Sequence, residues 1–263
     1  MKKYIVIGNP INHSLSPKLH NHWIKKNNID AIYEKKQISE SDINKIIDEV
    51  RNGKISGVNV TVPFKKSVIN YIEKLSPEAN ESQSVNTIYM ENNKIVGHNT
   101  DIMGFELGLK KTNYDVRNKV VFVLGAGGVA PSIILALKKM KCKKIILSNR
   151  TMKKAEELKK IYKDIELIDW GESPDFDMII NATSLGLNES DEINLDYASL
   201  GPNKFFYDII YNPRETNFLK KAKQFNNQTE NGKMMFIYQA HQAFTLWHKI
   251  KPIIDEETIG LLD

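Results

Sequence analysis

The sequence predicts an α/β fold with two domains, an N-terminal α/β domain with a mixed sheet and a Rossmann-like domain with a doubly wound sheet. Three observations lead to this fold class. Short apolar runs alternate with amphipathic stretches up to Asp101, a second series of the same kind begins at Val120, and a glycine-rich turn at residues 125–130 lies between a strand pattern and a helix pattern. A chain of 263 residues is long enough for two modest domains, each with its own core.

The first series contains three strands, two helices and a hairpin. We expect strands at residues 4–8, 31–37 and 55–61, and a helix at residues 17–26. Ser39 and Asp42 resemble a capping box before the helical pattern of residues 43–50, which Gly53 ends. Residues 87–90 and 95–99 flank Asn92 and Asn93, which favour a tight turn. Together these elements predict a mixed sheet covered by helices.

The second series predicts strands at residues 120–124, 144–148, 178–181 and 205–210, with helices between them. Alternation of this kind implies parallel strands joined by right-handed crossovers. An apolar helix from residue 233 to about residue 250 needs a partner for its large side chains. We expect it to return to the first domain, which gives one domain of residues 1–101 plus 233–263 and another of residues 102–232.

Composition argues against several classes of partner. The 37 basic residues exceed the 32 acidic ones by 5 and are scattered among acidic and amide residues, so we expect a solvated surface and no nucleic-acid role. Residues 120–137 carry no charge, but glycines and Pro131 interrupt them, which argues against a membrane span. Cys142 is the only cysteine, and the apolar run after Met1 is too short for a signal peptide, so we expect a cytoplasmic protein.

The turn at residues 125–130 fits the pattern G-x-G-x-x-[GA] of dinucleotide-binding loops. Its first glycine allows the tight turn, its second lets the backbone approach a pyrophosphate, and Ala130 keeps helix and strand close. Exposed amides at the helix start then receive the phosphates. The loop predicts cofactor contacts at Gly125, Ala126, Gly127, Gly128 and Val129; the alternative is a glycine turn without a ligand.

The end of the next strand predicts the choice of cofactor. An NAD enzyme usually places a carboxylate there for the ribose hydroxyls, but this chain reads Ser148-Asn149-Arg150-Thr151. Without that carboxylate, and with Arg150, Lys153 and Lys154 nearby, a 2′-phosphate is favoured and the cofactor is predicted to be NADP. The alternative is that these cations are ordinary surface charges.

Polar segments follow several of the predicted strands. They are residues 12–17, 59–65, 84–87 and 99–101, and they supply hydroxyls, amides, one ammonium and one carboxylate. Because strand ends in α/β sheets converge on a crevice, these groups suit a polyhydroxylated carboxylic acid. Taken singly, Ser14 and Ser16 are better explained as helix caps, and Asn86 as a turn residue.

Taken together, the segments closely resemble the shikimate dehydrogenase family, which includes quinate dehydrogenases. The matching motifs run through nearly the whole chain, from Gly8-Asn9-Pro10 and Ser14-x-Ser16-Pro17, through Asn149-Arg150-Thr151 and Asn181-Ala182-Thr183, to Tyr211-x-Pro213, Gly232 and Gln239. The resemblance implies an NADP-dependent oxidoreductase that interconverts 3-dehydroshikimate and shikimate in aromatic amino acid (chorismate) biosynthesis. In that family the two domains flank a cleft, and the acid binds to the first domain.

The resemblance also assigns roles to residues. It implies a catalytic pair, Lys65 and Asp101, and a substrate site made by Ser14, Ser16, Asn59, Thr61, Asn86, Tyr211 and Gln239. It implies further contacts with NADP by Asn149, Arg150, Thr151, Lys154, Ala182, Thr183, Ile209 and Gly232. Lys154 occupies a position where the family often has arginine, so we expect weaker binding of the 2′-phosphate.

Several alternatives stay open at this point. The enzyme could prefer quinate, accept both acids, or use NAD. A non-catalytic protein that binds NADP as a sensor is also possible, but it would not need both Lys65 and Asp101. Lys65 either transfers a proton or only orients the substrate. The six histidines form no convincing metal site, so no metal is expected. The sequence leaves the oligomeric state open, with a homodimer as one alternative.

Overall fold

The computed structural model describes all residues from Met1 to Asp263. The chain divides into two compact units, one made of Met1–Gly104 with Ile237–Asp263 and the other of Phe105–Phe236. Both divisions fall inside continuous helices, α4 (Asp101–Lys111) and α8 (Lys233–His248). None of the helices combines the length and the apolar character that crossing a membrane requires.

The unit made of Met1–Gly104 with Ile237–Asp263, called unit 1 below, contains a six-stranded mixed sheet with the order β2-β1-β3-β5-β6-β4. Strands β1, β2 and β3 are parallel, whereas β5 runs antiparallel to β3 and β6. The predicted mixed sheet is therefore confirmed. Its elements are β1 (Lys2–Gly8), α1 (Ser16–Lys26), β2 (Ala31–Gln37), η1 (Glu40–Asp42), α2 (Ile43–Arg51), β3 (Gly57–Val60), η2 (Ser67–Tyr71), β4 (Lys74–Leu75), α3 (Pro77–Ser82), β5 (Thr87–Glu91), β6 (Lys94–His98) and α9 (Glu256–Gly260).

One face of this sheet packs against α2. Because side chains alternate along a strand, Ile5 and Ile7 of β1 face the same side. They belong to one buried cluster with Ile43, Ile46 and Ile47, the apolar stripe of α2. The expected capping box at Ser39 and Asp42 is present and precedes this helix.

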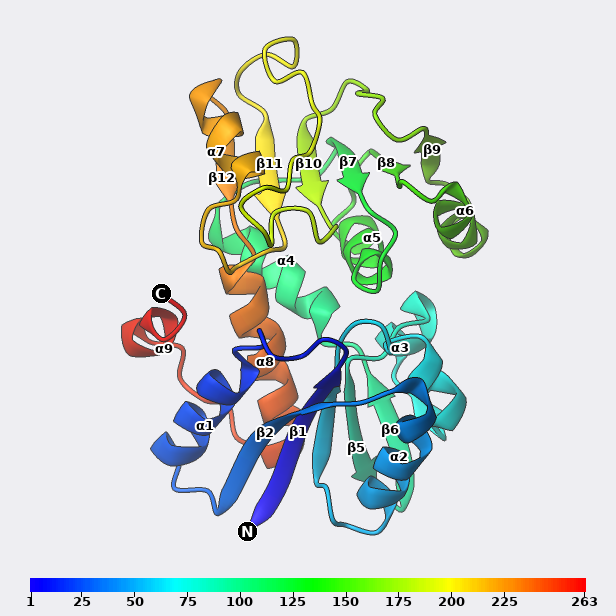
Figure 1. Cartoon of the computed structure of the whole chain (residues 1–263), viewed down its shortest axis with the longest axis vertical. Helices are drawn as coiled ribbons and strands as arrows, with labels where there is room; N and C mark the ends of the chain where they lie inside the picture. Colours follow the sequence, from blue (N-terminus) through cyan, green and yellow to red (C-terminus); the bar gives the residue numbers. More distant parts are fainter. The chain divides into compact units, whose positions relative to one another are not determined.

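Helices α1 and α8 lie on the opposite face (Figure 1). Their aromatic side chains form a layer against the sheet. Tyr4 of β1 and Tyr33 of β2 are register partners, and the Trp247 ring of α8 lies 5.0 and 6.1 Å from their ring centroids. Gly57 of β3 makes room for this ring, since a Cβ there would lie 2.6 Å from it. Tight packing of the aromatic layer against three strands explains why the chain returns to unit 1 after Phe236.

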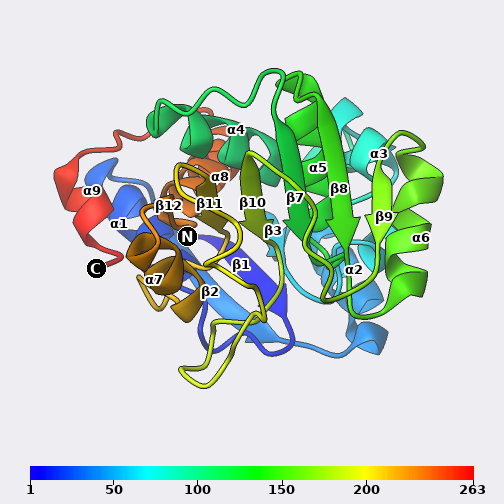
Figure 2. The ribbon, with the colours of Figure 1, turned by 90° about the horizontal axis from the view of Figure 1, so that it is seen from above.

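Phe105–Phe236, called unit 2 below, contains six parallel strands in the order β12-β11-β10-β7-β8-β9, which Figure 2 shows side by side. The strand order reverses direction at β7, as in a doubly wound sheet. The predicted Rossmann-like fold is confirmed. Its elements are β7 (Val120–Leu124), α5 (Ala130–Lys139), β8 (Lys144–Ser148), α6 (Met152–Ile161), β9 (Glu166–Ile168), β10 (Met178–Asn181), β11 (Phe205–Asp208), α7 (Asn217–Gln224) and β12 (Gln228–Glu230).

Candidate functional site

The topology of unit 1 brings four polar segments to one edge of the sheet, the edge formed by the carboxyl ends of β1 and β3. Strands β1 and β3 are parallel, so the residues after Gly8 and Val60 leave the sheet at the same edge. Strand β5 runs the other way, which places Asn86 and Thr87 at its start beside Asn59. Strand β6 returns and is followed by Asn99, Thr100 and Asp101. The segments that the sequence singled out therefore meet at this edge.

Lys65 and Asp101 form a buried ion pair in this region. The Lys65 Nζ atom donates to Asp101 Oδ2 over 2.6 Å, and the two side chains are 10% and 8% exposed. Asp101 is the first residue of α4, where the helix dipole favours a negative charge. Its other oxygen, Oδ1, accepts from Asn86 Nδ2 over 2.9 Å. Both oxygens of the Asp101 carboxylate therefore accept hydrogen bonds. The Lys65 ammonium has two further N–H donors.

Asn86 and Asn59 are buried beside this pair, 3% and 7% exposed. Asn86 donates its second amide proton to Thr100 Oγ1, while its Oδ1 atom accepts from the Thr100 amide over 2.8 Å. Asn59 donates to the Asn86 carbonyl and to Thr87 Oγ1, both over 3.1 Å. All amide protons of the two side chains are therefore used within the protein, and neither offers a donor to a ligand in this structure.

The remaining predicted substrate residues of unit 1 lie outside that network. Ser14 is half-buried in the loop after β1 and accepts from the Ser16 amide over 3.3 Å, and Ser16 is 7% exposed at the start of α1. Thr61 follows β3, which is shorter than predicted, and its amide donates to the Ile7 carbonyl. Gln239 is half-buried on α8.

The glycine loop of unit 2 has the geometry that its sequence predicts. Gly125 has a φ of +104°, and a Cβ there would lie 2.9 Å from Ala182 and 2.8 Å from Thr183, so only glycine fits. Gly127 is exposed, and its nearest atom to an added Cβ is 4.0 Å away, which leaves its backbone open to a ligand. Pro131 lies in the first turn of α5, as expected. Gly128 and Val129 are half-buried just before this helix.

The start of α6 supplies unpaired cations next to this loop. Asn149 connects the two segments, since its Oδ1 atom accepts from the Ala126 amide over 3.0 Å while its Nδ2 atom donates to the Thr151 carbonyl. Arg150 and Lys154 are exposed and form no ion pair with any acidic side chain of the chain. An anion at this position would therefore meet two uncompensated positive charges.

A second group of predicted residues surrounds the carboxyl ends of β10 and β11. Ala182 and Thr183 follow β10, and the Ala182 amide donates to the Leu124 carbonyl. Gly232 packs directly on the backbone of Ile209, because a Cβ there would lie 2.0 Å from the Ile209 oxygen. Tyr211 stacks on Phe236 with 4.2 Å between ring centroids. The structure thus gathers these residues at one end of the parallel sheet.

Asp208 organises the loops that carry this second group. Its carboxylate accepts from Thr216 Oγ1 over 2.6 Å, from the Ile210 amide over 3.0 Å and from Asn181 Nδ2 over 3.1 Å. No cation lies among these partners, and burial raises the pKa of Asp208 to about 6. Sequence analysis gave Asp208 no role, because it lies within the predicted strand of residues 205–210, whereas the observed strand β11 ends at Asp208.

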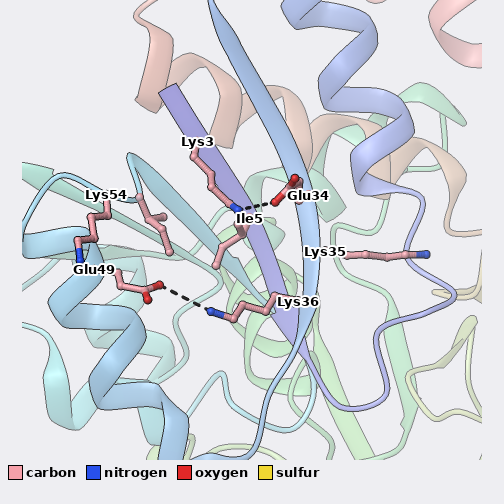
Figure 3. A pocket seen from close by; sticks show the side chains of 8 residues that line it. Lys3, Ile5, Glu34, Lys35, Lys36, Glu49 and Lys54 are labelled. Atoms are coloured by element: carbon pink, nitrogen blue, oxygen red, sulfur yellow. Dashed lines mark ion pairs between the residues drawn. The ribbon is translucent and has the colours of Figure 1, made fainter. Parts of the chain in front are cut away.

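A surface hollow of about 450 Å³ lies elsewhere in unit 1 (Figure 3). Its lining contains none of the predicted site residues. Lys3 faces Glu34 and Lys36 faces Glu49, at N–O distances of 2.6 and 3.7 Å, while Lys35 points away and donates to the Asn12 carbonyl. Because both of its glutamates are already paired with lysines and no predicted site residue lines it, we do not assign this hollow to the site.

One cluster has ligand atoms close enough to hold a metal, namely His22, Asp255 and Glu257, within 4.8 Å of one another. Lys26 already neutralises it, with its Nζ atom 2.9 Å from Asp255 and 2.5 Å from Glu257. An ammonium in that position repels a metal cation, so we interpret the cluster as a surface ion-pair network.

Two family models match most of the chain. The one described as the shikimate dehydrogenase substrate binding domain matches residues 6–88, and the one described as shikimate / quinate 5-dehydrogenase matches residues 106–227. A curated shikimate dehydrogenase (NADP(+)) from Pelagibacter ubique is 62% identical over 262 residues, which cover 100% of this chain and 99% of the relative.

Solved structures agree with these matches. A shikimate dehydrogenase in complex with NADP+ has a TM-score of 0.93 at 33% identity and covers 100% of this chain and 94% of its own. The enzyme from Thermus thermophilus, in complex with NADP(H) and shikimate, has a TM-score of 0.89 at 28% identity, with 100% of this chain and 98% of the other covered.

Proposed function

Because the chain belongs to the shikimate dehydrogenase family, we propose that it catalyses the NADP-dependent interconversion of 3-dehydroshikimate and shikimate in aromatic amino acid biosynthesis. The observation that carries this proposal is the buried pair of Lys65 and Asp101, because a metabolite sensor has no need for it. A charged pair that is taken out of water costs free energy, and an enzyme has a chemical use for it.

The residues of unit 2 fit the cofactor. The exposed backbone of Gly127 and the start of α5 receive the pyrophosphate, with Gly125, Ala126, Gly128 and Val129 shaping the turn. Arg150 and Lys154 pair with the 2′-phosphate, and Asn149 and Thr151 hold the segment that carries them. Ile209 and Gly232 contact the nicotinamide half, and Ala182 and Thr183 make further contacts with the cofactor. Unit 2 is accordingly the NADP domain, and unit 1 the substrate domain.

Hydroxyl and amide groups hold the substrate in this proposal. Ser14, Ser16 and Thr61 bind shikimate directly, and Tyr211 and Gln239 complete the set. Asn86 and Asn59 retain their predicted place at the site, but their amide protons are committed to neighbouring side chains and backbone. Their contribution is therefore to fix the shape of the site rather than to donate hydrogen bonds to the substrate.

Lys65 exchanges the proton in the reaction. Reduced NADP supplies the hydride that adds to the ring carbonyl carbon. As the carbonyl π electrons move onto the oxygen, the Lys65 ammonium gives that oxygen a proton and becomes a neutral amine, which regains a proton from solvent. Asp101 holds the ammonium in place through Oδ2, and Asn86 fixes the carboxylate through Oδ1. The reverse sequence oxidises the alcohol.

The proposal is tested by steady-state kinetics of the purified protein with shikimate and quinate, each with NADP and NAD. We expect kcat/KM to be highest for shikimate with NADP. An equal or higher kcat/KM with quinate would identify quinate as a substrate. An equal or higher kcat/KM with NAD would identify NAD as a cofactor. The absence of any acid-dependent cofactor reduction would favour a sensor. We place the enzyme in the cytoplasm, where the proposed biosynthetic reaction would draw on NADP.

A further inference from the structure

A continuous chain of buried hydrogen bonds runs from Tyr33 on the edge strand β2 to the catalytic pair. The Tyr33 hydroxyl donates to Asn59 Oδ1 over 2.7 Å, and Asn59 Nδ2 donates to Thr87 Oγ1 over 3.1 Å. The Thr87 hydroxyl donates to Asn86 Oδ1 over 3.0 Å, and Asn86 Nδ2 donates to Asp101 Oδ1 over 2.9 Å. Every link therefore donates in the same direction, toward the Asp101 carboxylate.

The direction of this chain follows from partners that can act in only one way. Asn59 Nδ2 also faces the Asn86 carbonyl, which can only accept, so the Asn59 oxygen must be the atom that faces Tyr33. Asn86 Oδ1 faces the Thr100 amide, which can only donate, so the Asn86 nitrogen must be the atom that faces Asp101. Both amide orientations are thereby fixed, and the Tyr33 hydroxyl, which faces Asn59 Oδ1, must donate. The Thr87 hydroxyl lies 3.0 Å from Asn86 Oδ1 and 3.4 Å from Thr100 Oγ1, and it donates to the nearer atom.

Tyr33 is itself held at its backbone and on its ring. Asn21 of α1 clamps the backbone, because its Nδ2 atom donates to the Tyr33 carbonyl over 2.8 Å and its Oδ1 atom accepts from the Tyr33 amide over 2.9 Å. The His20 ring stacks on the Tyr33 ring at 4.2 Å with an angle of 6° between their planes. A tyrosine held in this way reaches across β1 to Asn59 with little freedom to move.

We propose that Tyr33 is a positioning residue for the catalytic pair, acting through Asn59, Thr87 and Asn86 on Asp101. The inference rests on the proposed function. Hydrogen bonds that donate in series polarise one another in a low-dielectric interior, so the first donor strengthens the last. The chain fixes the carboxylate through Oδ1 and leaves Oδ2 for Lys65, which sets where the ammonium meets the substrate oxygen.

Tyr33→Phe tests the proposal because it removes the first donor and keeps the stacked ring. We expect kcat with shikimate to fall about five- to tenfold, with a change of less than about twofold in the KM values of shikimate and NADP, as for a lost transition-state interaction. Tyr4→Phe is the matched control. Tyr4 pairs with Tyr33 in the sheet register, contacts the same Trp247 ring and has a hydroxyl that interacts with the Ser56 side chain, but it is not part of the hydrogen-bond chain.

Thr87 allows a second test in the middle of the chain. Thr87→Val removes the hydroxyl at nearly constant volume and should lower kcat as Tyr33→Phe does, while Thr87→Ser keeps the hydroxyl and should retain most of the activity. In the double variant, Tyr33→Phe should add little to Thr87→Val, because both interrupt one chain, whereas Tyr4→Phe and Thr87→Val should be independent.

The outcomes separate this inference from the proposed function. A normal kcat in both Tyr33→Phe and Thr87→Val, with only a lower melting temperature like that of Tyr4→Phe, would overturn the positioning role. Equal losses of kcat in Thr87→Ser and Thr87→Val would overturn it as well, since the hydroxyl would then not matter. A wild-type protein without shikimate-dependent activity would instead overturn the proposed function.

Discussion

Lys65 keeps two N–H donors beyond the one that it gives to Asp101. If it transfers the proton, Lys65→Ala should lower kcat at least about a hundredfold with a modest change in the KM of shikimate, because the lost interaction belongs to the transition state. Asp101→Asn should also lower kcat, and the two losses should not add, since the residues act as a unit. Steady-state kinetics of the single and double variants measure both effects.

A raised KM with near-normal kcat in Lys65→Ala would contradict proton transfer. Lys65 would then be a cation that orients the substrate, which is the alternative that the sequence left open. Lys66→Ala provides the control, because the neighbouring lysine has the same charge but is not part of the buried pair.

Ser14 is expected to bind the substrate without affecting the cofactor. Ser14→Ala should weaken shikimate binding by about 1–3 kcal/mol, the usual range when a buried partner is left unpaired. Calorimetric titrations with shikimate and with NADP distinguish the two effects, and NADP affinity should hardly change. Unchanged shikimate affinity would remove Ser14 from the site.

His20 makes stability depend on pH. It is 1% exposed, neither ring nitrogen has a hydrogen-bond partner, and burial lowers its pKa from 6.5 to about 3. Below pH 6.5 His20 binds a proton in the unfolded chain but stays neutral in the folded chain. The free energy of unfolding therefore falls as the pH decreases. At pH 5 this loss is about 2 kcal/mol relative to pH 8.

His20→Phe should remove this loss, because phenylalanine fills the same aromatic layer and does not titrate. Urea unfolding of both proteins at pH 8 and pH 5 gives the difference in free energy of unfolding, in which the contributions of groups that do not interact with His20 cancel. We expect the variant to gain about 2 kcal/mol over the wild type between the two pH values. A constant difference would show that His20 binds a proton equally well in both states.

Among single residues, the sequence predicted those whose chemistry is unusual for their position. Lys65 and Asp101 stood out as charges within polar segments beside apolar strands, and the structure brings them together. Tyr33 was missed because a tyrosine in a strand is also what an ordinary apolar face contains. Its role depends on Asn59, which lies 26 positions further along the chain. Pairings of this kind are set by the order of the strands, which periodicity does not reveal.

Among the elements, the segment from β8 into α6 determines cofactor choice. Arg150→Ala should raise the KM of NADP about tenfold or more and leave NAD use nearly unchanged, because one charge-assisted contact with the 2′-phosphate is lost. Lys160→Ala, in the last turn of the same helix, is the matched control and should change neither value. An equal loss with both cofactors would show that Arg150 supports the fold of the loop and does not select the phosphate.

Elements with strong periodic patterns were predicted almost to the residue. Residues 31–37, 120–124, 144–148 and 178–181 are strands with these same bounds, and Asn92 and Asn93 adopt positive φ angles in the expected hairpin turn. The short strands β4, β9 and β12 were missed. Each has two or three residues, too few to show an alternation, and each lies at the edge of a sheet, where pairing with a single neighbour defines it.

At the scale of the whole molecule, unit 1 is built from two separate parts of the chain. Ile237, Ala240, Ala243 and Phe244 of α8 are fully buried, and α8 is the helix that covers Trp23, Tyr4 and Tyr33. In contrast, all six strands of unit 2 lie before Asn231. The two units therefore depend differently on the last part of the chain.

A chain that ends at Gly232 should consequently lose the fold of unit 1 and its shikimate binding, while NADP binding to unit 2 survives. Without α8 the aromatic layer is open to water, and Trp23, now fully buried, should show a red-shifted fluorescence. A milder variant, Phe244→Ala, leaves a cavity and should cost about 3–5 kcal/mol in urea unfolding. Phe225→Ala, at a site that is 40% exposed, should cost far less. A truncated protein that reduces NADP with shikimate would show that residues 1–104 fold without α8, and that the return of the chain is dispensable.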